Sequence, residues 1–207
     1  MSEVTTIASN EFVRVVNNAT LFAAKPKDGR PLLQCSEVTF LDEKTVRFVT
    51  TDSYDLIVET VEAEVSLAMV GHVRLVNLFN LKPLVVAAKS SPQGRTFARI
   101  AITTTIDNLS VELKDFATGA TFTQKVEGTY PDWRKLFDDS KFNGIASSDG
   151  TPLGLTLSRL GRLSKVRLYD RADDTVAARL EMHDVAKPYR MTIGQRITVY
   201  SMPVRLS

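Results

Sequence analysis

The chain has 207 residues, 43% of them apolar and 24% charged, with a formal net charge of +2. This length lets one domain, or one domain and a fraction, bury its own core, and the composition is that of an ordinary globular protein. No apolar run approaches membrane-spanning length, and the N-terminus, Met-Ser-Glu-Val-Thr-Thr, lacks the pattern of a secretion signal. A single cysteine, Cys35, cannot form an internal disulfide. We therefore expect a cytoplasmic protein, and the small net charge gives no evidence for a nucleic-acid partner.

The first part of the chain predicts one helix followed by antiparallel strands. Apolar residues recur at spacings of three and four, which is typical of an amphipathic helix, and Ser9 or Asn10 can cap its start. This stripe consists of Phe12, Val15, Val16, Ala19, Phe22 and Ala23. The Pro and Asp-Gly residues of 25–31 end the helix in a loop. Segments rich in Val, Thr, Phe and Ile, separated by turn residues, then predict strands at 35–41, 45–50 and 55–61.

The same order of elements recurs twice more. The second round has strands at 65–70 and 72–76, a helix with Pro83 in its first turn that Asn77 or Asn80 can cap, and strands at 97–104, 109–113 and 121–126. The third has a strand at 153–157, a helix at 158–165, and strands at 166–169, 177–182, 189–193 and 197–202. The polar, Gly/Ser-rich segment 138–150 predicts a loop. The pattern indicates three related modules and an α+β fold with antiparallel sheets.

The segment 127–137 joins the second and third rounds. It contains the single tryptophan, Trp133, and a Gly-Thr-Tyr-Pro turn signal. Pro131 favours an extended Tyr130, and Trp133 is too large and apolar for an exposed flexible linker. We therefore expect an ordered connector.

Residues typical of catalysis are scarce. His72 and His183 lie far apart and have no cysteine partners at metal-binding spacings, and no phosphate-binding loop or nucleophile elbow is present. Cys35 lies within an apolar strand pattern, where a buried thiol is more common than a nucleophile. The carboxylate pairs Asp52 and Asp55, and Asp173 and Asp174, are typical of turns. We expect neither an enzyme, nor a metal site, nor a cofactor.

Three segments resemble signatures of one protein family, the bacterial DNA polymerase III beta sliding clamp. The connector resembles its Gly-x-Phe-Pro-Asp-Tyr-Arg-Arg pattern, with Lys135 where the family usually has the second Arg. The segment 49–56 resembles its Ala-Thr-Asp-Gly-His-Arg-Leu signature, and 202–206 resembles its Met-Pro-Met-Arg-Leu tail. The resemblance implies a sliding-clamp fold. Residues 1–130 would form one complete pseudo-symmetric domain, and residues 131–207 a connector plus a partial second domain.

In that family the three segments wall an apolar pocket that accepts short Gln- and Leu/Phe-containing peptides from polymerases, clamp loaders and repair proteins. By resemblance, the peptide-binding residues here are Thr51, Ser53, Tyr54, Leu56, Pro131, Lys135, Leu136, Met202, Pro203, Val204, Arg205 and Leu206. The chain departs from the family at Ser53, which replaces a Gly suited to positive φ, at Tyr54, which replaces a His, and at Asp55, which replaces an Arg. Peptide preference can therefore differ from that of the family.

Clamp helices line a central hole and face DNA, so the resemblance also implies a set of DNA-facing residues. They are Arg14, Asn18, Lys25, Lys82, Lys89, Arg159, Arg162 and Lys165. Diffuse attraction to phosphates without base-reading side chains suits sequence-independent sliding on double-stranded DNA. An ordinary solvated helix face is the alternative interpretation of the same residues.

These observations leave two main functional hypotheses. The first is a reduced processivity clamp that tethers a DNA polymerase or another factor, and the second is a clamp-derived peptide-binding adaptor or decoy that does not encircle DNA. An isolated third module would expose a sheet edge and an apolar helix face. We therefore expect either a homo-oligomer or a monomer whose third module packs back on the first two.

Overall fold

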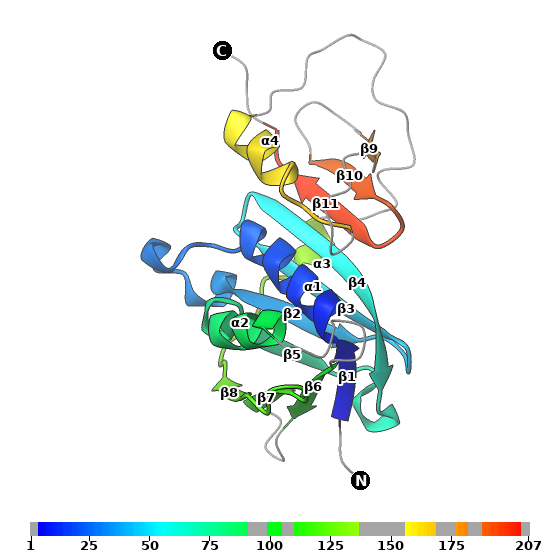
Figure 1. Cartoon of the computed structure of the whole chain (residues 1–207). Coiled ribbons are helices and arrows are strands. Elements are labelled where there is room, and N and C mark those ends of the chain that lie inside the picture. The colour runs from blue at the N-terminus through cyan, green and yellow to red at the C-terminus, as the bar shows by residue number, and fades with distance from the viewer. Residues whose placement is uncertain are drawn as a thin grey trace.

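The computed structural model describes residues 4–90, 99–104, 110–136, 156–168, 177–181 and 188–203 (Figure 1). The helices are α1 (Ser9–Phe22), α2 (Lys82–Ser90), α3 (Trp133–Leu136) and α4 (Leu157–Leu163). The strands are β1 (Val4–Ala8), β2 (Cys35–Phe40), β3 (Thr45–Thr51), β4 (Asp55–Val65), β5 (Val73–Asn77), β6 (Arg99–Thr104), β7 (Ser110–Asp115), β8 (Thr121–Lys125), β9 (Ala178–Glu181), β10 (Tyr189–Ile193) and β11 (Ile197–Ser201). All strand pairings among these residues are antiparallel, so the predicted α+β fold with antiparallel sheets is confirmed.

The first helix forms where its apolar periodicity predicts it. All six residues of the stripe are buried, and the helix packs on the sheet through them. Its start was predicted less well, because Ala8 is the N-cap and makes no side-chain capping bond. Ser9 lies inside the first turn, where it is buried. Before the second helix, Oδ1 of Asn77 accepts from the backbone N–H of Phe79 at 3.1 Å, although the N-cap of the short 3-10 turn at Phe79–Leu81 is Leu78.

The first two modules close on each other to form a nearly continuous ring of strands. The order is β5-β2-β3-β4-β1-β6-β7-β8, and the backbone N–H of Asn77 in β5 donates to Oε1 of Gln124 in β8 at 2.9 Å. Helices α1 and α2 contact each other. Apolar residues of both helices and of the surrounding strands form one core, which includes Phe12, Val16, Val38, Phe40, Leu84 and Ile102.

Strand β4 joins the third module to the first. Along one edge it pairs with β3 over its length, while along the other edge its end at Val65 pairs with β1 and its start at Asp55 pairs with β11. Strands β11, β10 and β9 continue from there as an antiparallel meander. Figure 1 shows α4 lying over β11 beside the end of α1. The third module therefore packs back on the first within one chain.

Several predicted boundaries were wrong. The segment predicted as a strand at 65–70 contains the end of β4 and a 3-10 turn at Leu67–Met69. Leu157, expected to end a strand, begins α4, and residues 166–168 are not in a strand. The loop expected at 138–150 lies outside the described residues. The division into two domains at residue 130 stays a prediction. Strand β11, which follows this residue, pairs with β4, which precedes it, so one sheet spans the predicted boundary.

Candidate functional site

The three segments predicted to meet do come together in the structure. The phenol of Tyr130 in the connector accepts a hydrogen bond from the backbone N–H of Thr51 at 3.2 Å, which ties the connector to the end of β3. The backbone N–H of Met202, just after β11, donates to the carbonyl of Tyr54 at 3.0 Å. The turn between β3 and β4 thus contacts both the connector and the C-terminal segment.

Beneath this meeting point lies a compact apolar cluster, which we call the junction core. It consists of Cys35, Val49, Leu56, Tyr130, Trp133 and Tyr200. Leu56 and Tyr200 face each other across the β4–β11 pair, and Trp133 and Tyr130 are 7% and 8% exposed. The expectation of an ordered connector is therefore confirmed. Burial raises the pKa of the Cys35 thiol to about 11, which fits the prediction of an unreactive interior cysteine.

Polar contacts fix the orientation of the tryptophan in this core. Its indole N–H donates to Oε1 of Glu37 at 3.2 Å, and Arg134 donates to the same oxygen at 3.0 Å. The Arg134 guanidinium also lies 4.4 Å from the centroid of the Trp133 ring, which is within the range of a cation–π contact. The single tryptophan is thus held on both its polar edge and its face.

The turn from Thr51 to Asp55 is shaped by Asp52. Its Oδ1 accepts from the backbone N–H groups of Tyr54 and Asp55, both at 2.9 Å. Ser53 adopts φ 87°, the left-handed region that favours glycine. The position keeps the backbone conformation that the family's Gly suits, although it holds a serine.

The predicted peptide-binding residues divide into exposed and buried groups. Ser53, Tyr54, Pro131, Lys135 and Met202 are exposed and Pro203 is half-buried. Two of the twelve require a correction: Leu56 is 0% and Thr51 6% exposed, because both belong to the packed interior of the junction and do not form an open wall. The side chain of Leu136, and all of Val204, Arg205 and Leu206, lie outside the described residues.

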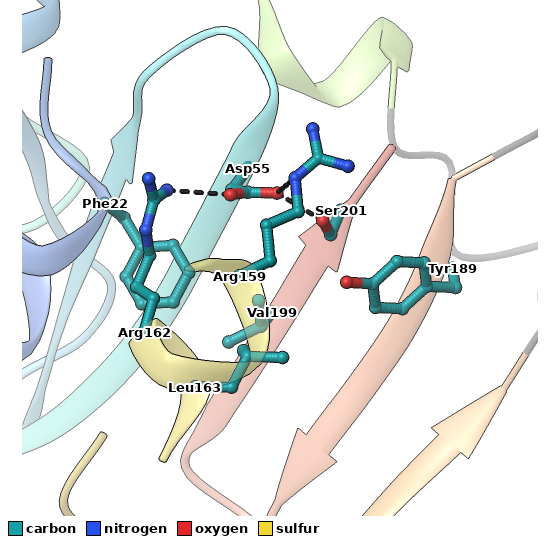
Figure 2. Close-up of a pocket in the computed structure, with 8 residues that line it drawn as sticks. All are labelled: Phe22, Asp55, Arg159, Arg162, Leu163, Tyr189, Val199 and Ser201. Atoms are coloured by element: carbon teal, nitrogen blue, oxygen red, sulfur yellow. Dashed lines mark hydrogen bonds and ion pairs between the residues drawn. The ribbon is translucent and has the colours of Figure 1, made fainter. Parts of the chain in front are cut away.

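On the opposite face of the β4–β11 pair, a group of charged side chains joins α4 to the first module (Figure 2). Arg162 donates to Asp52 and to Asp55, both at 2.7 Å. Arg159 lies 3.3 Å from Asp55 and donates to the carbonyl of Met202, and the hydroxyl of Ser201 donates to Asp55. Burial raises the pKa of Asp55, while these partners favour its charged form. We call this set of contacts the Asp55 latch.

The latch borders a narrow pocket that is also lined by Phe22, Leu163, Tyr189 and Val199. The Tyr189 side chain is 1% exposed, and its hydroxyl points towards Ser201 in Figure 2. Sequence reasoning did not find this pocket, since its lining comes from segments more than 100 residues apart.

A second buried polar group joins α1 to the third module. Arg14 forms ion pairs with Glu59 and with Glu11, the latter at 2.9 Å. Asn18 donates to Glu59 at 3.0 Å and to the carbonyl of Arg167 at 2.7 Å, and it accepts from the Arg167 backbone N–H at 2.9 Å. Burial raises the pKa of Glu59 to about 7 against the opposing attraction of Arg14. The polar side of α1 thus serves as an internal contact.

These two groups correct the prediction of eight DNA-facing residues. Arg14 and Asn18 are 3% and 1% exposed, so they do not lie on a solvent-facing surface. Arg159 and Arg162 are partly exposed but are occupied by Asp52 and Asp55. Lys25, Lys82, Lys89 and Lys165 remain exposed. Helical spacing identified the polar sides of α1 and α4 correctly, but it could not show that contacts between the first and third modules occupy them.

No protein-family model matches the sequence, and no curated protein sequence matches it either. Solved structures, in contrast, match the whole chain. The DNA polymerase III beta subunit of Thermotoga maritima matches with a TM-score of 0.71 at 13% identity, over 100% of this chain and 67% of its own. The sliding clamp of Bacillus subtilis matches with a TM-score of 0.68 at 13% identity, over 100% of this chain and 65% of its own. The Pseudomonas aeruginosa clamp bound to griselimycin matches with a TM-score of 0.66 at 15% identity, over 100% and 66% of the two chains.

The chain therefore has a DNA-clamp fold. More particularly, it has the fold of the bacterial beta sliding clamp and spans about two-thirds of the length of those clamps. The resemblance recognised from three short segments is confirmed at the level of the fold. Among the described residues, no helix is long and apolar enough to span a membrane, and no group of three or more His, Cys, Asp or Glu side chains is arranged to hold a metal ion.

Proposed function

We propose that the protein is a non-catalytic, cytoplasmic tethering factor that binds short linear peptides at the junction of its first and third modules. The observation that carries this proposal is the convergence of the β3–β4 turn, the connector and the C-terminal segment, through the Thr51–Tyr130 and Tyr54–Met202 hydrogen bonds. Partners would be DNA polymerases and clamp-loader-type proteins that carry clamp-binding peptides.

The surface available to such a peptide is a patch that we call the junction patch. It consists of Tyr54, Pro131, Lys135, Met202 and Pro203. Tyr54 is 59% and Met202 36% exposed, so two adaptable or aromatic side chains are free to contact a Leu or Phe anchor. Lys135 forms a surface ion pair with Asp132 at 3.0 Å, in which both side chains are exposed. A small, mostly apolar site of this kind supports affinities on the order of micromolar.

The buried junction core gives this patch a rigid base. Leu56, Trp133 and Tyr200 pack together beneath it, and the peptide would rest on side chains that are already ordered. Pre-organisation of this kind reduces the entropic cost of binding. Leu56 then contributes by supporting the patch, in place of the direct wall contact expected from the sequence.

Binding of a fluorescent peptide that contains Gln, Leu and Phe tests the proposal directly. We expect saturable binding to the full chain, a loss of about tenfold or more, or roughly 1.4 kcal/mol, for Tyr54→Ala and for Met202→Ala, and no binding after deletion of residues 202–207. Leu67→Ala is the matched control, since Leu67 is 74% exposed in a 3-10 turn outside the patch. Absence of saturable binding at hundreds of micromolar, roughly the limit of a useful site, would overturn the proposal.

Two versions of this tethering function remain: an adaptor that does not encircle DNA, and a clamp that encircles double-stranded DNA. Because Arg159 and Arg162 are already paired with carboxylates, the structure favours the adaptor. Of the eight predicted DNA-facing residues, the four exposed lysines remain available to phosphates, while Asp52 and Asp55 hold Arg159 and Arg162. A DNA-tracking clamp should bind duplex DNA weakly at low salt, with affinity that falls steeply as salt rises. Anisotropy of labelled duplex DNA separates the two candidates, because the adaptor shows no such binding while peptide binding persists.

A further inference from the structure

The third module presents apolar side chains to solvent along α4 and β9. Leu157 is 85% and Leu160 44% exposed on α4, and Leu180 is 48% exposed on β9. Leu157 and Leu160 are three residues apart, so they share one side of the helix. Leu163, on the next turn, packs against the apolar cluster around Phe22 and Val199. One flank of α4 is therefore used within the chain, while the flank with Leu157 and Leu160 faces outwards.

Among the described residues, β9 forms the edge strand of this module's sheet. Strand β9 pairs with β10, and no other described strand lies along it. An edge strand and an exposed helix flank in the same module are features that proteins normally cover. Their presence together indicates an interaction surface.

The same chain shows how modules of this kind are completed. Strand β1 of the first module pairs with its own β4 and with β6 of the second. In the same way, β5 of the second module pairs with β2 of the first and contacts β8 of its own through Gln124. The two helices pack flank to flank, with Val13, Val16, Val85 and Ala88 in their common core. Each module thus covers the other's helix flank in a pseudo-two-fold arrangement.

From this internal template we propose that the third modules of two copies of this chain pack against each other through α4, around Leu157 and Leu160. The pair would build, between two chains, a unit like the one that the first two modules form within one chain. A contact between identical surfaces related by a two-fold axis closes at two copies.

The charges on α4 permit this approach. Its two arginines, Arg159 and Arg162, are already neutralised by Asp52 and Asp55 of the same chain. Two such helices can therefore approach each other without bringing unpaired guanidinium groups together, and the leucines face outwards from the latch. This inference concerns assembly and goes beyond the proposed peptide site.

The test is the molar mass of the full chain in solution, measured by sedimentation equilibrium up to concentrations on the order of 100 µM. We expect the mass to rise from 22.9 kDa for one chain to that of two chains. The double variant Leu157→Glu/Leu160→Glu should remain a single chain, because charges on the contact oppose burial. Leu67→Glu, at a 74% exposed leucine outside α4, should associate like the wild type.

The possible outcomes are distinct. A wild-type chain that stays monomeric throughout this concentration range overturns the inference. So does a double variant that associates like the wild type. Larger assemblies support it only if the double variant abolishes them. Because neither leucine lies in the junction patch, the double variant should keep its peptide affinity, so failure of this inference is distinguishable from failure of the proposed function.

Discussion

Glu59 and Arg14 form the most deeply buried ion pair among the described residues. Their side chains are 2% and 1% exposed. Asn18 donates to Glu59 and the Arg167 carbonyl accepts from Arg14, while Nε of Arg14 has no hydrogen-bond partner within the described part of the chain. Such a pair does not by itself imply high stability, since desolvation offsets much of the attraction. Replacing only one of the two residues is costly, because the other then remains buried without its partner.

Arg14→Met should therefore destabilise the protein strongly. We expect a loss of about 1–3 kcal/mol, the cost of a buried polar group that loses its partner, in the free energy of unfolding measured with urea at neutral pH. The loss stays below that of a permanently charged buried group, because Glu59, whose pKa is already raised to about 7, can take up a proton when Arg14 is absent. Lys135→Ala is the control, because the Lys135–Asp132 pair is 82% and 52% exposed and such surface pairs contribute about 1 kcal/mol or less. Equal losses in the two variants would contradict the assignment of Arg14 to the interior.

The raised pKa of Glu59, about 7 against an ordinary 4.5, predicts a pH dependence. The folded chain binds this proton more tightly than the unfolded chain, so the contribution to stability is full below pH about 4.5 and is lost as the pH rises through about 7. Between these values the free energy of unfolding should fall more steeply for the wild type than for Glu59→Gln, which does not titrate. Urea unfolding at several pH values measures both slopes, and equal slopes would contradict the prediction.

At the scale of elements, β4 holds the modules together. Its start pairs with β11 while its end pairs with β1, and the Asp55 latch reinforces the first of these contacts. Asp55 occupies the position where the clamp family has an arginine, and it forms ion pairs with Arg159 and Arg162 on α4. The reversed charge that the sequence placed at the edge of the peptide pocket acts in the structure as a contact between modules.

Arg162→Met should loosen the third module and leave the first two intact. Asp52 and Asp55 would each lose a partner at 2.7 Å, at a cost of about 1–3 kcal/mol for buried groups left unsatisfied. Hydrogen exchange should show faster exchange at β11 and the start of β4, with little change at β2 and β6. Uniform loss of protection over all strands would show instead that the latch stabilises the whole chain.

The elements themselves were largely predictable from local pattern. Apolar periodicity gave α1 and α2, and runs of β-branched residues gave β2, β3 and β4 to within a few residues. No local pattern predicted that Arg162 pairs with Asp52 and Asp55, or that Arg14 and Asn18 are buried. A polar residue gives the same sequence pattern whether it faces solvent or packs against a distant module. Apart from Glu11, three residues from Arg14, the partners of these arginines and of Asn18 lie between 41 and 153 residues away.

At the scale of the whole molecule, the chain combines a pair of modules whose strands form a nearly continuous ring with a third module that docks beside it. This arrangement accounts for a clamp-type fold in a chain that spans about two-thirds of the length of the clamps it matches. It also leaves the junction patch and the flank of α4 on separate surfaces. Peptide binding and self-association can therefore be examined independently.

The most direct test of the central claim uses Trp133, the single tryptophan, which gives one indole N–H signal in a proton–nitrogen NMR spectrum. Trp133 packs with Leu56 and Tyr200 beneath the junction patch, so a peptide containing Gln, Leu and Phe that binds there should shift this signal saturably. The backbone signals of Tyr54 and Met202 should shift with the same apparent affinity, on the order of micromolar. An indole signal that stays unmoved at hundreds of micromolar peptide, roughly the upper limit of a useful site, would contradict the account.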